Sequence, residues 1–470
     1  MGLSAATIWE VRATNGLDTN GGGFVAGAAG TDYSQQNAKN SGGTDSSTTD
    51  AVAAGTTTIT SATASFGTSI IGNIIYLQGG TGSLAAGWYQ VTARSNATTI
   101  TVDRTVATGT GITMNIGGAL QTINQMATNM ITSNVGYVKA EATYTTTSNI
   151  TFSAGGGFTA TVPRTIVRGY TSTRSDNGQA TLQLSTNTGL TGFAISSAAV
   201  SLYNITVDCN NLGTSIGISV TAGGGSLFYN CKVLNFTSKG ISLSAASQVV
   251  FCEVTAGTSA ASGGITTSSI CTFYGCYVHD NACIGISDSG NSVVVRNIIA
   301  NNTGASSDGY SNSGGSGNSN PVMFNTIYGN GRHGIFYATT SAQRLILNNI
   351  LANNGGYGIN GCSAAGMAAI PLTDGNAYFS NTSGTRNNMD DTTTNKQNNV
   401  TPYTNIYDQT CTSSPFNNAG SKDWTLNFTS TGGSKCRSQG VPQNFPLALS
   451  GNRPWIDMGA IQHQDPGTFI

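Results

Sequence analysis

Between residues 205 and 360 the chain repeats a short pattern of apolar and polar positions. Around each repeat the side chains alternate with a period of two, as they do in a β-strand. A glycine followed by an apolar residue marks one strand-like segment, and successive marks lie 21 to 25 residues apart: Gly217-Ile218, Gly240-Ile241, Gly264-Ile265, Gly285-Ile286, Gly309-Tyr310, Gly334-Ile335 and Gly358-Ile359. A second apolar series keeps the same phase: Val207, Val233, Val254, Val278, Ile299, Ile327 and Leu351. Two strand-like segments per ~24 residues predict the coils of a parallel β-helix.

Other repeat architectures fit this spacing less well. A leucine-rich repeat has a similar length, but it requires a Leu/Asn consensus that these repeats lack. A propeller blade is nearly twice as long. We therefore expect an all-β solenoid.

The phase of the repeats predicts which side chains stack on successive coils, ~4.8 Å apart. Two residues before each member of the second series, one interior column reads Ile205, Cys231, Cys252, Cys276, Asn297, Asn325 and Asn349. We expect its cysteines to be buried thiols. Three residues after the series, a second column holds Asn210, Asn281, Asn302, Asn330 and Asn354, which predicts an asparagine ladder at a turn.

The rest of the chain suggests the other parts of the molecule. Apolar residues at helical spacing in 118–131 predict a helix that covers the first coil. Residues 1–116 do not follow the coil period and contain three short strand-like runs, at 70–77, 87–91 and 98–102. We expect an N-terminal β domain or attachment region (1–116), a capping helix (117–131), the parallel β-helix (132–400) and an irregular C-terminal cap (401–470). Trp424, Phe428 and Trp455 in the last part are expected to cap the end of the solenoid or to form a trimer contact.

Composition narrows the possible partners. The 470 residues include 62 glycines, only 8% are charged, and the formal net charge is -1. Nucleic acids and anionic membranes need a basic face, so neither is expected as the main partner. No apolar run approaches the ~20 residues of a membrane span, and no signal peptide is recognised at the N-terminus. The nine cysteines form no CxxC pair, so we expect neither a metal site nor disulfides, and no cofactor.

The chain resembles the right-handed parallel β-helix proteins of the pectate-lyase-like class. The stretches Val138–Thr145 and Val167–Tyr170 are similar to the "V-x-x-x-G-T-Y-T … I-x-G-Y" opening of that class, with Ala142 in place of the usual Gly. Ser413-Ser414-Pro415 … Asn418-Ala419-Gly420 and the later Asp457-Met458-Gly459-Ala460 are similar to its endings. The resemblance covers residues 118–462 and implies a single-stranded right-handed β-helix.

The N-terminal leader carries a second resemblance. Trp9-Glu10-Val11-Arg12, Gly21-Gly22-Gly23-Phe24 and Gly30-Thr31-Asp32-Tyr33-Ser34 look like leaders of bacteriophage β-helix proteins. This resemblance implies a virion appendage such as a tailspike. Such appendages are typically trimeric and fold in the host cytoplasm.

Catalytic residues are harder to find. The Asp pairs of polygalacturonase-like enzymes are not recognised, and Asp390-Asp391 lies in a polar stretch that is typical of a loop. The residue before each Gly-apolar mark gives a better candidate, because it places Asp308, His333 and Tyr357 on consecutive coils, with Arg332 adjacent. An Asp beside a His would raise the imidazole pKa and could orient the ring as a general base, and Arg332 could hold an anionic sugar. The same column can also be a polar stripe beside a turn without any chemical role.

Hydrolysis needs two carboxylates, and the nearest second one is Asp288, one coil back. We therefore expect glycan binding at Asp308, Arg332, His333 and Tyr357, without hydrolysis.

Two further pairs of charged or titratable residues have simpler interpretations. His279 and Asp280 are neighbours in a strand and should point to opposite faces, whereas Lys232 and Glu253 should form a surface ion pair on adjacent coils.

Three functional hypotheses remain. The first is a phage virion appendage, a homo-oligomer expected to be a trimer, that contacts host surface polysaccharide and binds phage tail or capsid proteins through its N-terminal region. The second is a polysaccharide lyase or glycoside hydrolase on a β-helix scaffold. The third is a bacterial surface or filament-forming structural protein. The expected location is the virion, with an extracellular or cell-surface location as the alternative.

Overall fold

The computed structural model describes residues 3–152, 164–185, 189–196, 199–259, 263–314, 320–338, 344–361, 372–387, 407–440 and 457–461. The chain divides into two compact units. The first comprises Met1–Ser185, Thr191–Val207 and Thr221–Ser226, and the second comprises Thr186–Leu190, Asp208–Val220 and Leu227–Ile470. Among the described residues, no helix has both the length and the apolar character that a membrane crossing requires.

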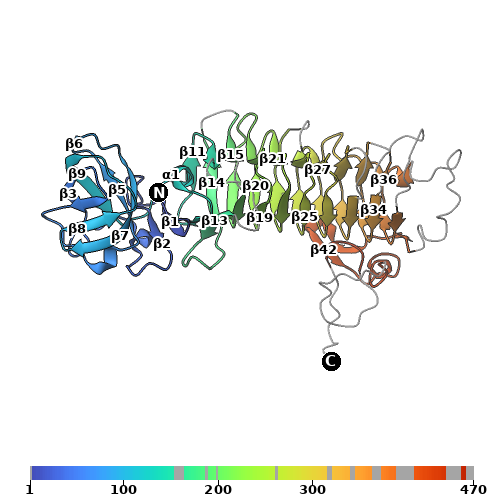
Figure 1. The fold of residues 1–470 in the computed structure, drawn as a ribbon. Coiled ribbons are helices and arrows are strands. Elements are labelled where there is room, and N and C mark those ends of the chain that lie inside the picture. Colours follow the sequence, from blue (N-terminus) through green and yellow to red (C-terminus); the bar gives the residue numbers. More distant parts are fainter. Residues whose placement is uncertain are drawn as a thin grey trace, which may run out of the picture. The chain divides into compact units, whose positions relative to one another are not determined.

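The first unit contains a small antiparallel β domain (blue in Figure 1). Its strand order is β3-β4-β8-β7-β5-β9-β6, and an additional β3–β9 pairing joins strands from the two ends of that order. The strands are β3 (Thr48–Ala53), β4 (Thr58–Thr60), β5 (Ile74–Gln78), β6 (Thr81–Gly82), β7 (Gly87–Asn96), β8 (Thr99–Val102) and β9 (Gly109–Ile116). Their inward residues, such as Ile75, Val91 and Ile100, build a core of their own. The strand-like runs at 87–91 and 98–102 are confirmed as β7 and β8, whereas the run at 70–77 becomes a strand only from Ile74, because a 3-10 helix ends at Ile70.

The first unit also contains the opening coils. Strand β1 (Thr7–Val11) pairs in parallel with β10 (Val135–Lys139), so the chain contributes to the stacked sheet before it forms the small β domain. The strands that follow are β11 (Tyr144–Thr146), β12 (Ile150–Phe152), β13 (Thr165–Tyr170), β14 (Ala180–Leu184), β15 (Thr191–Ile195), β16 (Val200–Tyr203) and β17 (Ile205–Asp208); β2 (Gly23–Val25) flanks β1. Helix α1 (Ile123–Asn129) is shorter than the apolar spacing predicted. The Thr122 hydroxyl caps its N-terminus by accepting a hydrogen bond from the Gln125 N–H, and Ile123, Met126 and Ala127 are buried.

The second unit is built from three parallel sheets (Figure 1). Sheet 1 contains β19 (Ser226–Tyr229), β22 (Ser247–Val250), β25 (Thr272–Tyr274), β28 (Val293–Val295), β31 (Asn320–Met323), β34 (Arg344–Leu347) and β37 (Leu372–Asp374). Sheet 2 contains β20 (Lys232–Leu234), β23 (Glu253–Thr255), β26 (Tyr277–His279), β29 (Ile298–Ala300), β32 (Thr326–Tyr328), β35 (Ile350–Ala352), β38 (Ala377–Phe379) and β40 (Gln409–Thr410). Sheet 3 contains β18 (Ile216–Val220), β21 (Lys239–Leu243), β24 (Gly263–Thr267), β27 (Ile284–Asp288), β30 (Tyr310–Asn312), β33 (Ile335–Tyr337), β36 (Tyr357–Asn360) and β39 (Gly384–Asn387).

Each regular coil therefore has three strands, one more than the sequence pattern predicted. The alternating run 227–233 looked like one strand, but Asn230 in its middle adopts a left-handed backbone with φ 51° and divides it into β19 and β20. Residues with similar φ recur between sheets 1 and 2 on later coils, among them Phe251 (φ 52°), Gly275 (φ 66°) and Arg296 (φ 58°). These residues share no side-chain type, so the corner left no signal in the sequence.

The interior columns have the predicted register. Cys231, Cys252 and Cys276 are buried and free. The column continues as an amide ladder, in which the Nδ2 of Asn297, Asn325 and Asn349 each donates to the Oδ1 of the asparagine on the next coil, at 3.0, 3.0 and 2.9 Å. The last acceptor is Asn376. Each ladder oxygen also accepts a backbone N–H from the preceding coil, so the buried amides are largely satisfied.

A second ladder follows sheet 2. The side-chain amides of Asn281, Asn302, Asn330 and Asn354 form the same relay and end on Asn381, with distances of 2.8 to 3.0 Å. Asn210 was also expected in this ladder and is not part of it. Asn210 and Asn211 both adopt positive φ values, of 53° and 54°, and place Asn210 on the surface, while Cys209 is buried.

The described part of the C-terminal segment is irregular and packs against the side of the coils. Its short strands are β41 (Phe416–Asn418) and β42 (Asp423–Leu426). Phe416, Trp424 and Leu426 form one apolar cluster with outward residues of sheet 2, among them Ile298 and Tyr328. Trp424 thus covers a lateral face and not the last coil. Phe428 remains 74% exposed, and Trp455 lies outside the described residues.

Candidate functional site

The outward face of sheet 3 brings the four predicted site residues together. Ile286, Tyr310, Ile335 and Ile359 are register partners on β27, β30, β33 and β36. Two residues earlier on each coil, the same register aligns Ile284, Asp308, His333 and Tyr357. The column predicted from the sequence is therefore present. On it the His333 and Tyr357 rings contact each other, whereas the Asp308 carboxylate contacts Arg332 and the backbone of His333.

Asp308 is fully buried, and its carboxylate is used to hold its neighbours. It accepts a hydrogen bond from Arg332 Nε at 2.8 Å, a second from Arg332 Nη2, and a third from the His333 backbone N–H at 3.1 Å. The hydrogen bonds from Arg332 raise the pKa of its guanidinium. Asp308 does not bind the imidazole, so it orients Arg332 and the backbone of His333 but not the ring.

His333 differs from a poised general base. Its Nδ1 accepts a hydrogen bond from the Tyr357 backbone N–H at 3.0 Å, and its Nε2 lies 2.8 Å from Asn360 Nδ2. Burial has the largest effect and lowers the pKa of the imidazole; the charge of Asp308 raises it by less, and that of Arg332 lowers it by less still. Asp308 does raise this pKa, as expected, but burial outweighs the carboxylate, so the net shift is downward. The lowered pKa favours the neutral ring, whose Nδ1 lone pair accepts the Tyr357 N–H.

Three rings lie in stacked pairs at this place, which we call the aromatic shelf: Phe336, His333 and Tyr357. The His333 ring lies 5.7 Å from that of Phe336, at an interplanar angle of 24°, and 5.9 Å from that of Tyr357, at 26°. All three are half-buried. The Arg332 guanidinium stands 4.5 Å from the centre of the Phe336 ring.

The sequence column did not include Phe336 or Asn360. They belong to the next outward column of sheet 3, three residues further along each coil, where Ser311, Phe336 and Asn360 are register partners. Asn387 extends this column and donates a hydrogen bond to Asn360 Oδ1 at 3.1 Å. The repeat could have located this second column, because Phe336 and Asn360 directly follow the inward Ile335 and Ile359, and neighbouring residues of a strand point to opposite faces.

Asp288 does not supply a second carboxylate to this face. It points into the coil and is fully buried. Its oxygens accept hydrogen bonds from Tyr310 Oη at 2.8 Å, from Asn320 Nδ2 at 3.1 Å and from the backbone N–H groups of Gly290 and Ser292, each at 2.8 Å. Asp288 is therefore part of the interior and faces away from Asp308.

The second His-Asp pair is in contact, contrary to the expectation. His279 Nδ1 lies 2.8 Å from Asp280 Oδ2, and His279 Nε2 lies 3.1 Å from Glu253 Oε1. Asp280 has φ 53°, and this left-handed conformation at the end of β26 breaks the strand alternation that would have separated the two side chains. The expected ion pair between Lys232 and Glu253 is present at 2.9 Å. Lys422 of the C-terminal segment pairs with Asp280 at 2.6 Å, so this cluster fastens that segment to sheet 2.

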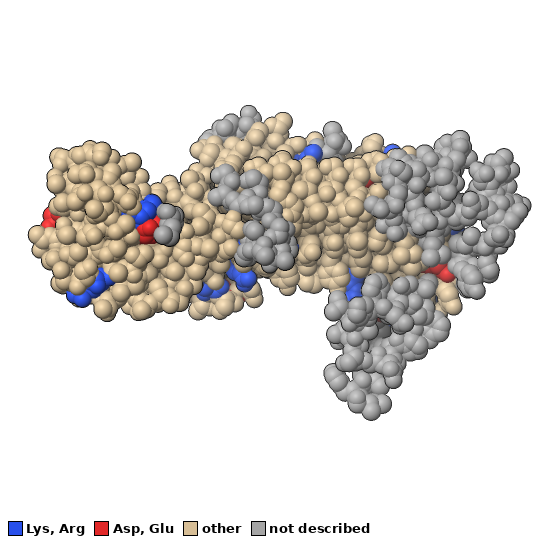
Figure 2. Space-filling model, viewed as in Figure 1, with Lys and Arg blue, Asp and Glu red and all other residues tan. Residues whose placement is uncertain are grey.

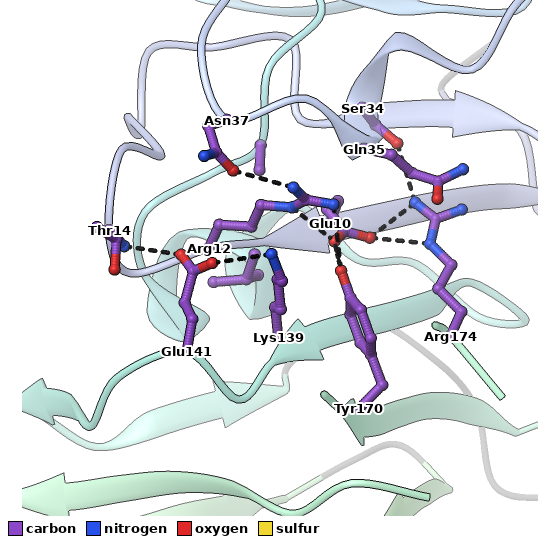
Figure 3. A network of polar contacts seen from close by, with 12 residues as sticks. Glu10, Arg12, Thr14, Ser34, Gln35, Asn37, Lys139, Glu141, Tyr170 and Arg174 are labelled. Atoms are coloured by element: carbon purple, nitrogen blue, oxygen red, sulfur yellow. Dashed lines mark hydrogen bonds and ion pairs between the residues drawn. The ribbon is translucent and has the colours of Figure 1, made fainter. Parts of the chain in front are cut away.

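A buried ion network in the first unit is structural (Figure 3). Glu10 is fully buried, pairs with Arg12 at 3.1 Å and with Arg174 at 2.8 Å, and accepts a hydrogen bond from the Tyr170 hydroxyl. Arg174 also pairs with Asp32 at 2.8 Å. Burial and the charge of Glu10 raise the pKa of Tyr170. Both cations and the hydroxyl compensate the buried Glu10 carboxylate, and Arg174 also compensates Asp32, so the network joins strands and loops of the first unit.

The described residues offer neither a cluster of metal-ligating side chains nor a basic surface for nucleic acid. In the described parts of the chain, no three His, Cys, Asp or Glu residues are grouped so that they could hold a metal ion. Asp390 and Asp391 lie outside those parts. On the face seen in Figure 2, charged residues are few and scattered among uncharged ones.

Comparisons with known proteins address the fold. No protein-family model and no curated protein matches the chain. Among solved structures, the chain is similar to pectate lyase Pel9A, with a TM-score of 0.55 and 16% identity over 74% of this chain and 92% of that chain. The fold is a right-handed parallel β-helix. Further matches are ORF18 of Geobacillus virus E2 (TM-score 0.36, 14% identity, 54% of this chain and 52% of that one) and tailspike protein 3 of bacteriophage CBA120 (TM-score 0.27, 10% identity, 56% and 55%). The pectate-lyase-like β-helix expected from the sequence is thus confirmed, together with the small N-terminal β domain.

Proposed function

We propose that this β-helix protein binds a glycan on the outward face of sheet 3. The aromatic shelf carries the proposal. Flat, half-exposed rings offer apolar area at a small entropic cost, and they suit the C–H faces of sugar rings. Beside them, the Asn360 and Asn387 amides and the Arg332 guanidinium provide donors and acceptors for hydroxyl groups.

The arrangement favours binding over cleavage. Glycoside hydrolysis typically uses two carboxyl groups ~5–9.5 Å apart. On this face Asp308 is buried and saturated by Arg332 and the His333 N–H, and Asp288 points into the coil. A lyase or hydrolase remains the alternative, to be decided by the products of the reaction.

We further propose that the protein is a phage appendage of the tailspike or fibre type, located on the virion. The support is the leader at residues 9–34, with its likeness to bacteriophage β-helix proteins, and the β-helix fold itself. In this proposal the N-terminal region attaches to tail or capsid proteins, and the coils contact the host surface polysaccharide.

The test of binding uses Phe336→Ala. Purified host envelope polysaccharides are immobilised, and binding of the wild-type protein is compared with that of the variant. Loss of one stacking ring is expected to weaken binding about tenfold, since each 1.4 kcal/mol changes affinity tenfold. Phe428→Ala is the matched control, because Phe428 is 74% exposed and lies on the C-terminal segment. Equal binding by wild type and Phe336→Ala would exclude the shelf as the site.

The same incubations test for catalysis. We expect neither new reducing ends nor unsaturated products after prolonged incubation. Turnover that disappears in Asp308→Asn would overturn the non-enzymatic proposal and assign catalysis to this face. Turnover that survives the substitution would place catalysis elsewhere on the chain.

A further inference from the structure

A hollow lies on the same face of sheet 3, several coils before the aromatic shelf. Its volume is about 300 Å³, and β21, β24 and β27 line it. The floor is Gly263, which has no side chain between its column neighbours Lys239 and Ile284. A Cβ atom at position 263 would approach Thr266 Cγ2 to 2.9 Å, so any side chain there would crowd the floor of the hollow.

The walls of this hollow are rich in hydroxyl groups. Ser242, Thr266 and Ser287 are register partners and form its outward row, with Ser244, Ser268 and Ser289 at the ends of the strands. The hydroxyl oxygen of Thr266 is buried and has no hydrogen-bond partner. A buried, unpaired hydroxyl loses free energy unless a ligand or a water molecule satisfies it.

The only charged residue among the described residues that line the hollow is a lysine. Lys239 is half-buried at its edge and makes no ion pair with any described residue, while no carboxylate is among the lining residues. By contrast, Lys232 on sheet 2 forms an ion pair with Glu253. An unpaired ammonium group beside hydroxyls is suited to an anionic group on a polar ligand.

We infer that this hollow is a second sugar subsite, which takes a sugar unit bearing a negative charge, with Lys239 as the specificity-determining cation. The inference rests on the proposed glycan-binding function. Gly263 and Tyr357 are four coils apart in the same outward column, a separation of ~19 Å at ~4.8 Å per coil. One oligosaccharide segment lying along sheet 3 would therefore occupy the hollow and the aromatic shelf together. The anionic group is a carboxylate or a phosphate, since an ammonium group accepts either.

The test compares Lys239→Gln with the wild type on purified acidic and neutral bacterial surface polysaccharides. Each acidic polysaccharide is also used in two treated forms, one with its carboxyl groups chemically reduced and one dephosphorylated. We expect wild-type binding to an acidic polysaccharide to fall about tenfold in Lys239→Gln and to be retained in Lys239→Arg. Only one of the two treatments should abolish the difference, and that treatment identifies the anion. Higher salt should weaken wild-type binding more than that of Lys239→Gln.

Controls separate this inference from the proposed function. Lys232→Gln removes a cation from sheet 2 and should leave binding unchanged. Gly263→Val fills the hollow, and its circular dichroism spectrum shows whether the coils still form. Wild-type binding to neutral polysaccharides alone, or unchanged binding by Lys239→Gln, would overturn the charged subsite and leave the aromatic shelf standing. If the wild-type protein binds no polysaccharide, the proposed function fails and this inference fails with it.

Discussion

At the scale of single residues, burial decides what each charged group can do. The sequence placed Asp308, Arg332, His333 and Tyr357 in one column, because outward positions follow directly from the repeat. It could not give the chemistry of the column, since that depends on how deeply each group lies. Asp308 is fully buried and bound by Arg332, and burial lowers the pKa of His333. A column of polar residues in the sequence therefore predicts which side chains lie close together, but not their protonation states.

The lowered pKa of His333 predicts a pH-dependent contribution to stability. Because the folded pKa lies below the unfolded value of ~6.5, the unfolded chain binds the proton first as the pH falls. The contribution is therefore complete above pH ~6.5 and is lost as the pH falls through that value towards the folded pKa. We expect the urea midpoint to decrease from pH 7.5 to pH 5, and to decrease less in His333→Gln. The same decrease in both proteins would contradict this role for His333.

At the scale of elements, stacking made the interior predictable. Valine, cysteine and asparagine recur at fixed positions because each interior residue lies on the same type of residue one coil away. The corner between sheets 1 and 2 was missed because Asn230, Phe251 and Arg296 share only a left-handed backbone. The same kind of turn at Asp280 brought together a His-Asp pair that strand alternation would have separated. The C-terminal segment has no repeat, so the packing of Trp424 on sheet 2 could not be predicted from residue spacing.

The amide ladder should contribute strongly to stability. Asn325 accepts two hydrogen bonds from Asn297 and donates to Val294 O at 2.9 Å and to Asn349 Oδ1 at 3.0 Å. Asn325→Ala leaves buried donors and acceptors unpaired, so we expect a loss of about 3 kcal/mol in the free energy of unfolding. Urea denaturation measures the loss. Gln248→Ala, at an exposed position of β22, should change stability by less than ~0.5 kcal/mol. A similar small change in both variants would show that the ladder is not stabilising.

The cysteine column should be chemically inert in the folded protein. Burial raises the pKa of the Cys276 thiol to about 12 and that of Cys252 well above its ordinary value. Thiolates are the reactive form, so alkylation of Cys231, Cys252 and Cys276 should be slow at pH 8 and become fast in urea. Peptide mass spectrometry after timed labelling identifies each site. Rapid native labelling of any of the three would show that the register of the interior is wrong.

At the scale of the whole molecule, the described surfaces of the second unit differ in character. Sheet 3 presents the polar hollow and the aromatic shelf, and the C-terminal segment covers part of sheet 2. Sheet 1 and its corner carry a row of aromatic side chains among polar ones, in which Tyr229 and Phe251 are 39% and 49% exposed. Edge-to-face contacts connect Tyr229, Phe251 and Tyr274 at 5.6 and 5.5 Å, beside the half-buried Val250 and Val295. Contiguous apolar area of this kind is typical of an interface.

This apolar face gives the proposed trimer a specific prediction. If the protein is a homotrimer, light scattering at micromolar concentration should give a mass about three times the 48.0 kDa of one chain. If sheet 1 forms the contact, the double variant Tyr229→Ser/Phe251→Ser should shift the population towards the monomer, because it removes two large side chains that dominate such interfaces. Ile270→Ser is the control, since Ile270 is at least as exposed, at 54%, but precedes β25 and takes no part in the contacts of Tyr229, Phe251 and Tyr274. A trimer that survives the double variant would place the contact elsewhere, whereas a wild-type monomer would count against the appendage proposal, since tailspike-like appendages act as oligomers.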